Sequence, residues 1–472
     1  MQPLNRQTAN STTQRPVKVL QFGEGNFLRG FVDWIIDILN EKTDFNGAVE
    51  VVQPIDKGIV HLINQQDGLY HVLLEGLQNG QPTQETRLIT CITHALNPYE
   101  DYKSYLKRGE NPELEFIISN TTEAGISFEA ADASPDTIPS SFPGKLTALL
   151  YRRFQTFNGA ADKALTIIPC ELIEKNGENL RQTVLQFAQH WNLPQEFTSW
   201  IENNTIFCNT LVDRIVPGFP KDNIKDIQAD LGFEDNLVVK AEPFHLWVIE
   251  APASVAKAFP TDQADLQVKF VDDLTPYRTR KVRILNGAHT TLVPVAYLQG
   301  IRTVREAVED EKAGTFIREA IFEEIIPTLD LSAKELEQFA NDVMERFQNP
   351  FIRHELASIA LNSVSKYKVR VLPSVLEFQA RNGRMPQRLL HSLAALILFY
   401  KGEWNGEQTP VNDSADVMEV FNNAWKKGTA AETVQAILSH QEFWGTDLTQ
   451  IEGLQAMVTQ ELEKIQASEG KL

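Results

Sequence analysis

Short apolar runs alternate with amphipathic stretches along the first half of the chain, and this alternation predicts a parallel β-sheet covered by helices. The clearest strand candidates are VKVLQF, AVEVVQPI, LEFIISN and ALTIIPC, which begin at residues 17, 48, 114 and 164. After about residue 275 the apolar positions recur with helical spacing, as in TVREAVEDEKAGTFIREAIFEEIIPTL. The fold class expected is α/β, with a Rossmann-like doubly wound sheet domain over 1–274 followed by a predominantly α-helical domain over 275–472.

Each of the four predicted strands runs directly into polar residues. These are Gly23 to Asn26, Asp56, Asn120 to Glu123, and Cys170 with Glu171. Ligands of open α/β sheets gather outside the carboxyl ends of the strands. We therefore expect these four places to line one crevice.

Two local patterns support the helical second half. Ser332 followed by Glu335 predicts a capping box at the start of a helix. The longest apolar run, residues 389–400, is too short to cross a bilayer and contains His391 and Ser392. This run is expected to form a buried helix, and no membrane association is predicted.

Composition narrows the classes of partner. The 472 residues are 42% hydrophobic and 23% charged, which is typical of globular domains. The net charge of -19 argues against binding to nucleic acid or anionic lipid, so an anionic ligand needs local basic groups.

Cysteine usage bears on the compartment. The three cysteines are widely spaced, which suggests neither a disulfide framework nor a zinc site, and no metal site is predicted. The polar N-terminus lacks the apolar core of a signal peptide. A cytoplasmic monomer is the default expectation.

The stretch VLQFGEGNFLRGFVDWIID predicts a strand, a glycine turn and a helix. Gly23 and Gly25 fill the first two glycine positions of a dinucleotide-binding turn, but Leu28 occupies the third and the next glycine is Gly30. The spacing alone is a weak signal and favours an ordinary strand-to-helix connection over a nucleotide site.

The segment RKVRILNGAHTTLVPVAYL carries candidate chemistry. At about 100° per residue on an α-helix, Asn286 lies roughly 140° and His289 roughly 80° from Lys281, so all three share a broad face. Apolar neighbours would lower the pKa of the lysine and suit it to proton transfer, while the amide could donate to an oxyanion. The alternative is a solvated lysine, a turn-forming asparagine and a core histidine.

These three residues match the lysine, asparagine and histidine motif of the long-chain polyol dehydrogenases, the mannitol dehydrogenase family. GEGNFLRGF resembles that family's variant phosphate turn, in which asparagine and arginine replace the third glycine. The resemblance continues through VVQPIDKG, SNTTEAGI, CELIEKNG, TLVDRIVPG and RFQNPFIRHELASIALNSVSKYKVRVLPS. It therefore covers nearly the whole chain.

The resemblance implies an NAD-dependent, metal-independent interconversion of a keto sugar acid and an aldonate. Lys281 would be the general acid and base, Asn286 the oxyanion donor, and His289 an aid to substrate positioning. Asp56 would bind the ribose hydroxyls and repel a 2′-phosphate, which favours NAD over NADP. The residues assigned to the cofactor are Gly23, Gly25, Asn26, Phe27, Arg29, Asp56, Asn120, Thr121 and Glu123.

The substrate side shows both matches and departures. Asp213 and Lys366 match substrate-contacting positions, and Glu123 matches a carboxylate that the family places beside the lysine. Leu172 stands where mannitol dehydrogenases have a second asparagine, and Ser358 where they have a substrate arginine. Basic residues in PYRTRKVR and SKYKVR, with Lys366 foremost, are candidates to bind a carboxylate.

A small-molecule sugar acid is therefore the expected partner. Another keto sugar acid or a polyol is the alternative substrate within the same chemistry. A non-catalytic NAD-responsive binding protein is the alternative from a different class.

Overall fold

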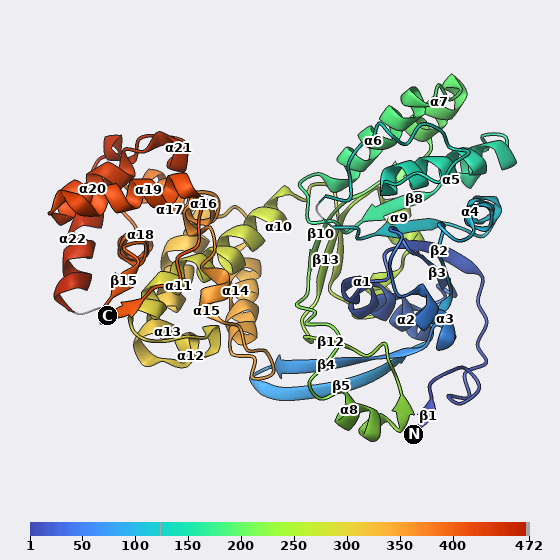
Figure 1. Cartoon of the computed structure of the whole chain (residues 1–472), viewed down its shortest axis with the longest axis horizontal. Helices are drawn as coiled ribbons and strands as arrows, with labels where there is room; N and C mark the ends of the chain where they lie inside the picture. Colours follow the sequence, from blue (N-terminus) through green and yellow to red (C-terminus); the bar gives the residue numbers. More distant parts are fainter. Residues whose placement is uncertain (123, 469–472) are drawn as a thin grey trace. The chain divides into compact units, whose positions relative to one another are not determined.

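The computed structural model describes residues 1–122 and 124–468 (Figure 1). It divides into two compact units. The first comprises Met1–Glu75 and Thr83–Leu274, and the second comprises Gly76–Pro82 and Thr275–Leu472.

A six-stranded parallel sheet forms the centre of the first unit. Its order is β6 (Ile92–Leu96), β3 (Ala48–Val52), β2 (Val17–Phe22), β7 (Phe116–Ser119), β8 (Thr166–Pro169) and β9 (Ile206–Phe207). The chain begins in the middle, builds outward to one edge and then returns to build the other, which is the doubly wound topology. The four predicted strands are β2, β3, β7 and β8, so the predicted fold class is confirmed.

Successive residues of a strand point to opposite faces, and both faces of this sheet are covered. Val19 of β2 lies in a core cluster with residues of α2 (Val32–Lys42). The next residue, Leu20, lies in a second cluster with residues of α5 (Phe142–Thr156). Burial on both faces explains why these strands read as continuous apolar runs.

Two smaller sheets of the first unit were not predicted from the sequence. One contains β12 (Val239–Ala241), β4 (Tyr70–Gln78) and β5 (Gln81–Ile89), and the other contains β10 (Asn209–Asp213), β13 (Leu246–Glu250) and β14 (Val268–Val271). β5 reads QPTQETRLI and is mostly exposed, so it has no apolar run to reveal it. The tip of the β4–β5 hairpin groups with the second unit.

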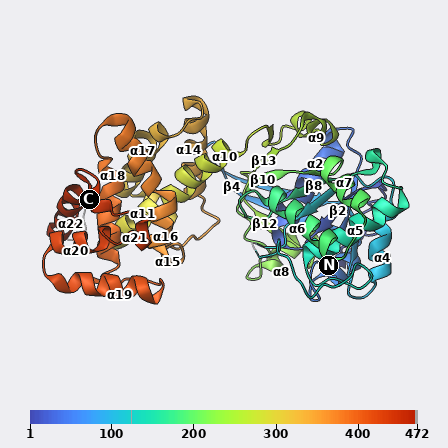
Figure 2. The ribbon, with the colours of Figure 1, turned by 90° about the horizontal axis from the view of Figure 1, so that it is seen from above.

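The second unit is predominantly helical. The helix α14 (Ala333–Phe347) begins where predicted, with Ser332 Oγ accepting a hydrogen bond from the backbone N–H of Glu335. The predicted buried helix is α18 (Gln387–Phe399), which packs against both α11 (Gly287–Leu298) and α22 (Leu454–Ala467) (Figure 2). Within the described part of the chain, no helix has the length and apolar character needed to span a membrane.

Candidate functional site

The glycine turn after β2 combines a glycine of positive φ with open space at the next glycine. Gly23 adopts φ 122°, and a Cβ atom there would lie 2.9 Å from the carbonyl oxygen of Asn120. Gly25 directly precedes the short helix α1 (Asn26–Gly30), and a Cβ atom there would have no other atom within 4 Å. Gly23 is therefore required by the packing of the turn, whereas Gly25 leaves space beside backbone N–H groups that attract anions.

The buried side chain of Arg29 stabilises this turn through hydrogen bonds. Its side chain is 3% exposed, and its Nε donates to the carbonyl oxygen of Glu24 at 3.0 Å. The two Nη atoms donate to the Asn26 side chain and to the carbonyl oxygen of Leu237. The guanidinium is thus buried and bonded to the protein, which suits it to support the turn, and the cofactor contact predicted for Arg29 stays a prediction.

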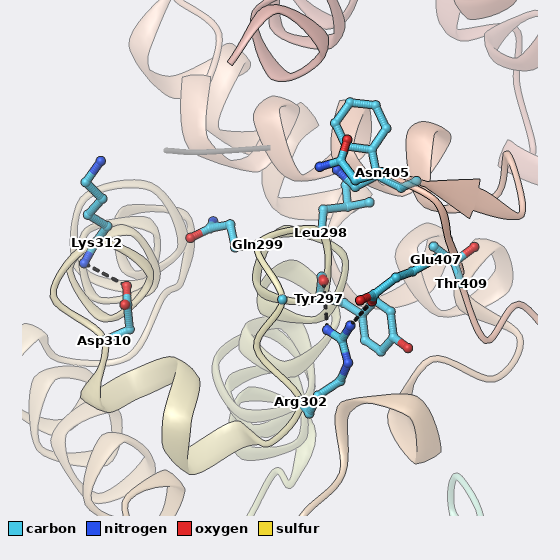
Figure 3. Close-up of a pocket in the computed structure, with 11 residues that line it drawn as sticks. Tyr297, Leu298, Gln299, Arg302, Asp310, Lys312, Asn405, Glu407 and Thr409 are labelled. Carbon is cyan, nitrogen blue, oxygen red and sulfur yellow. Dashed lines mark hydrogen bonds and ion pairs between the residues drawn. The ribbon is translucent and has the colours of Figure 1, made fainter. Parts of the chain in front are cut away.

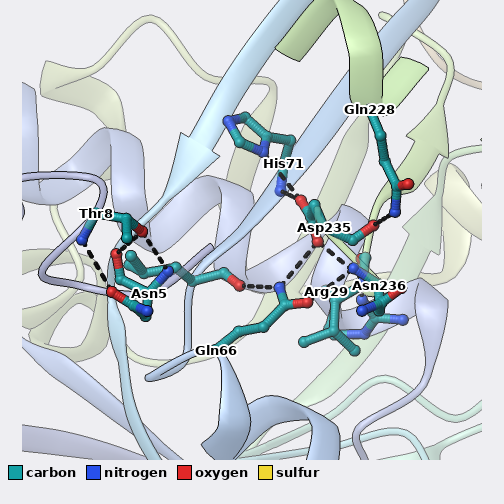
Figure 4. A network of polar contacts seen from close by, with 10 residues as sticks. Asn5, Thr8, Arg29, Gln66, His71, Gln228, Asp235 and Asn236 are labelled. Carbon is teal, nitrogen blue, oxygen red and sulfur yellow. Dashed lines mark hydrogen bonds and ion pairs between the residues drawn. The ribbon is translucent and has the colours of Figure 1, made fainter. Parts of the chain in front are cut away.

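A buried polar network anchors the carbonyl group that Arg29 binds (Figure 4). Asp235 is fully buried and accepts hydrogen bonds from the backbone N–H of His71 at 2.8 Å and from Gln66 Nε2 at 2.9 Å. It also accepts one from the N–H of Leu237 at 2.9 Å. The position of the Leu237 carbonyl, and through it Arg29, is therefore fixed by the fold.

Asn26 and Phe27 occupy the first turn of α1. The Asn26 side chain lies so close to Gly218 that a Cβ there would be 2.4 Å from its Nδ2 atom. The Phe27 ring stacks on Phe31, with the ring centroids 5.1 Å apart. Phe27 thus packs partly into the core, and the cofactor role predicted for both residues stays a prediction.

Two buried polar residues beneath the turn escaped the sequence reasoning. Gln21 Nε2 donates to the carbonyl oxygen of Gly23 at 3.1 Å and to Asp33 Oδ2 at 3.3 Å, and both side chains are fully buried. A signal was present, because each is a polar residue inside an otherwise apolar run, VLQF and FVDWII.

The loop after β7 is tied to the end of β8. Asn120 Nδ2 donates to the carbonyl oxygen of Cys170 at 3.0 Å. The backbone N–H and the hydroxyl of Thr121 both donate to Glu171 Oε1 at 3.0 Å. Burial raises the pKa of Glu171. This buried acid, which the sequence predicted only to line the crevice, positions Thr121, whereas the Cys170 carbonyl oxygen holds the Asn120 side chain.

Strain accompanies this loop. Thr122 adopts φ 80°, an unfavourable conformation for a β-branched residue, and such strain gathers at functional sites. Glu123, the next residue of the prediction, lies outside the described residues.

Asp56 lies on the loop beyond β3. Its side chain is exposed, and its backbone carbonyl oxygen accepts a hydrogen bond from Gln53 Nε2 at 3.2 Å. Because β2, β3, β7 and β8 run parallel, their carboxyl ends meet at one edge of the sheet. The polar residues predicted to line one crevice are therefore brought to the same edge.

The predicted catalytic motif lies on one helical segment of the second unit, formed by α10 (Thr275–Arg280), η4 (Lys281–Asn286) and α11. The stretch η4 is a π-helix, with i→i+5 rather than i→i+4 hydrogen bonds. The angle between Lys281 and Asn286 expected for an α-helix is therefore wrong. Short π-helical turns are rare, and many of those that occur lie at functional sites.

All three residues of the motif are half-buried. The backbone carbonyl of Asn286 accepts from the Thr290 hydroxyl at 2.9 Å. Its side-chain amide makes no hydrogen bond to any residue within 1–122 and 124–468. His289 stacks on Phe347 with centroids 4.3 Å apart and meets His354 edge-on at 5.1 Å, so the two rings hold its plane.

Two cations lie on α16 (Ser363–Arg370), a helix packed against α11. A Cβ on Gly287 would lie 3.2 Å from the Arg370 carbonyl oxygen, so glycine allows the two helices to approach closely. Lys366 Nζ donates to the carbonyl oxygen of Ile359 at 2.8 Å. Burial and then the charge of Arg370 lower the pKa of Lys366, and burial lowers the pKa of Arg370.

The other basic and substrate candidates have different surroundings. Arg280 is 3% exposed and pairs with Glu335 at 3.1 Å, and Arg283 Nη1 donates to Ser374 Oγ at 3.1 Å. Asp213, at the end of β10 in the first unit, is 5% exposed. Leu172, at the position of the family's second asparagine, is 60% exposed.

A cavity of about 390 Å³ opens near the C-terminal end of α11 (Figure 3). Arg302 lies in its wall, where it donates to the carbonyl oxygen of Tyr297 at 3.1 Å and pairs with Glu407. Tyr297 is ten residues beyond Gly287, or about 15 Å along the helix. This cavity lies away from the motif, and its arginine is already engaged.

Two family models match this chain, one in each of its two parts. The model of the mannitol dehydrogenase Rossmann domain matches residues 17–263, and that of the mannitol dehydrogenase C-terminal domain matches residues 273–466. The chain is 50% identical to the altronate oxidoreductase of Phocaeicola vulgatus, over 99% of this chain and 98% of that protein. It is 49% identical to the altronate oxidoreductase of Bacillus subtilis, over 96% and 93% of the two chains.

Solved structures show the same fold. Substrate-free D-sorbitol dehydrogenase gives a TM-score of 0.83 at 22% identity and covers 99% of both chains. The Pseudomonas fluorescens mannitol 2-dehydrogenase complex with NAD and D-mannitol gives 0.69 at 23% identity, covering 99% of this chain and 98% of that one. From the domain models and the relatives of about half identity over nearly the full length, the chain belongs to the mannitol dehydrogenase family.

Proposed function

We propose that this protein is an NAD-dependent oxidoreductase that interconverts D-tagaturonate and D-altronate. The observation that carries the proposal is its identity of about half, over nearly the full length, to altronate oxidoreductases. The motifs around Gly23, Thr121, Glu171 and Lys281 also resemble those of tagaturonate reductase, another name for that enzyme.

The proposed chemistry is the reduction of a ketone to a secondary alcohol. NADH, when bound, supplies the hydride that adds to the keto carbon. The Lys281 ammonium donates a proton to the oxygen as negative charge develops on it, and the reverse oxidation returns that proton to the lysine. The Asn286 amide, which has no described partner, donates a hydrogen bond to the same oxygen, and His289 orients the substrate.

The first unit is proposed to bind the cofactor. Gly25 leaves room for the pyrophosphate, and the exposed carboxylate of Asp56 suits the ribose hydroxyls. Asn26, Phe27, Asn120, Thr121 and Glu123 are retained as proposed cofactor contacts. A carboxylate at Asp56 would repel the 2′-phosphate of NADP, so NAD is the preferred cofactor.

The second unit is proposed to recognise the substrate carboxylate. Lys366 and Arg370 lie one helical turn apart on α16, and placing two like charges together is unfavourable unless an anion joins them. A sugar acid provides such an anion, whereas a polyol does not. Asp213 is retained as a proposed contact to substrate hydroxyls.

A cytoplasmic location and a monomeric state belong to the same proposal. All three cysteines are free and buried, which is compatible with a reducing compartment.

The proposal is tested by initial rates of NADH oxidation with tagaturonate, fructuronate and fructose at equal concentrations. We expect the highest kcat/KM with tagaturonate, and a rate at least about tenfold lower when NADPH replaces NADH. Preference for fructuronate would identify a fructuronate reductase, and preference for fructose a mannitol 2-dehydrogenase. NADH binding without turnover of any compound would favour an NAD-responsive binding protein.

A further inference from the structure

The fully buried acid beneath the glycine turn has no part in the proposed mechanism. Asp33 lies on α2, and its Oδ2 atom is 3.3 Å from Gln21 Nε2 and 3.1 Å from the Tyr70 hydroxyl. Its other oxygen, Oδ1, is buried and has no hydrogen-bond partner among residues 1–122 and 124–468. Leaving a buried carboxylate oxygen unsatisfied is costly.

Gln21 has the complementary deficiency. Its Nε2 atom faces two acceptors, the Gly23 carbonyl oxygen at 3.1 Å and Asp33 Oδ2, which fixes the orientation of the amide. Its Oε1 atom is buried and, within the described chain, accepts no hydrogen bond. An amide that meets a carboxyl group edge to edge offers one donor and one acceptor. The unsatisfied atoms, Oε1 and Oδ1, are the two that such a pair would join.

The geometry points to a protonated Asp33 that acts as a positioning residue for cofactor binding. With the proton on Oδ1, Asp33 donates to Gln21 Oε1 while Gln21 Nε2 donates to Asp33 Oδ2, and both buried oxygens are satisfied. Loss of that proton places two acceptors against each other and turns the amide away, which releases its hydrogen bond to the Gly23 carbonyl. Because this inference concerns affinity for NADH, it rests on the proposed function.

Neighbouring groups act on this acid in both directions. Burial is the largest influence and raises the pKa of Asp33 to about 7. Hydrogen bonds from Gln21 and Tyr70 and the charge of Arg29 lower this pKa, whereas the charge of Asp37 raises it further. The thiol of Cys91, which donates to the Asp33 backbone carbonyl at 3.4 Å, is also nearby. Since the protonated form binds, affinity for NADH is highest below pH 7 and falls as pH rises through this value.

The test is the Kd of NADH between pH 5.5 and 8.5 at constant ionic strength, for the wild-type protein and three variants. The wild-type Kd should rise above pH 7 by up to about tenfold per pH unit, because only the protonated fraction is competent. Asp33→Asn keeps the side-chain pair with Gln21 but has no titrating proton. This variant should therefore bind NADH with the same affinity at every pH in the range. Tyr70→Phe removes a donor to the carboxylate and should move the midpoint to higher pH.

Asp37→Asn is the matched control, because it removes a carboxylate one turn further along α2 and should retain a pH-dependent Kd. Weak binding by Asp33→Asn at every pH, or the same pH dependence in that variant as in the wild type, would overturn the inference while leaving the proposed function intact. If the wild type bound no NADH at any pH, the proposed function would fail and the inference with it.

Discussion

At the scale of single residues, we propose that Lys366 decides whether the site prefers a sugar acid or a polyol. Lys366 is held by the Ile359 carbonyl oxygen and lies one turn from Arg370, so the cation has a defined position before substrate arrives. A charge-assisted hydrogen bond to a carboxylate contributes about 1.5–3 kcal/mol. The sequence identified these basic residues as candidates to bind a carboxylate. It did not distinguish Lys366 and Arg370 from Arg280, because the ion-pair partner of Arg280, Glu335, lies 55 residues away.

We predict that Lys366→Met lowers kcat/KM for tagaturonate by roughly 10- to 100-fold and leaves that for fructose within about twofold. The reason is that only the acid loses an ionic partner. Steady-state kinetics with both compounds measure this. Lys368→Met, on the same helix, serves as the control and should retain the preference for the acid. Equal losses for the two substrates in Lys366→Met would show that the lysine does not read the carboxylate.

At the scale of secondary-structure elements, the sequence predicted the strands and helices whose own residues form an apolar pattern. The strands β2, β3, β7 and β8 were identified because both of their faces are apolar. The exposed strand β5 was missed because its place depends on pairing with β4 rather than on its own residues. The π-helix at Lys281–Asn286 was also missed, since no residue pattern separates it from an α-helix.

Alanine substitutions of the two turn glycines should have different effects on stability and on NADH binding. Gly23→Ala places a Cβ 2.9 Å from the Asn120 carbonyl oxygen at φ 122°, and should cost on the order of 1–3 kcal/mol of stability. Gly25→Ala meets no atom within 4 Å and should leave the free energy of unfolding nearly unchanged while weakening NADH binding. Urea unfolding and NADH titration measure the two effects. Wild-type NADH affinity in Gly25→Ala would show that the pyrophosphate does not approach there.

On the scale of the whole molecule, we propose different tasks for the two units. The glycine turn at Gly23 and Asp56 belong to the first unit, whereas Lys281, Asn286, His289 and Lys366 belong to the second. The net charge of -19 repels anions in general, so binding of a dinucleotide and a sugar acid requires local groups of the kind described above. Because the residues proposed to bind the cofactor lie in the other unit, loss of Lys281, the proposed proton donor, should leave cofactor binding largely intact.

The most direct measurement is the rate of NADH oxidation with tagaturonate by Lys281→Ala, with the Kd of NADH determined on the same preparation. We expect kcat to fall by about 10²- to 10⁴-fold, the usual contribution of general acid catalysis, while the Kd stays within about threefold of the wild-type value. Lys334→Ala, at an exposed position of α14, is the control and should be fully active. Wild-type turnover by Lys281→Ala would contradict the account.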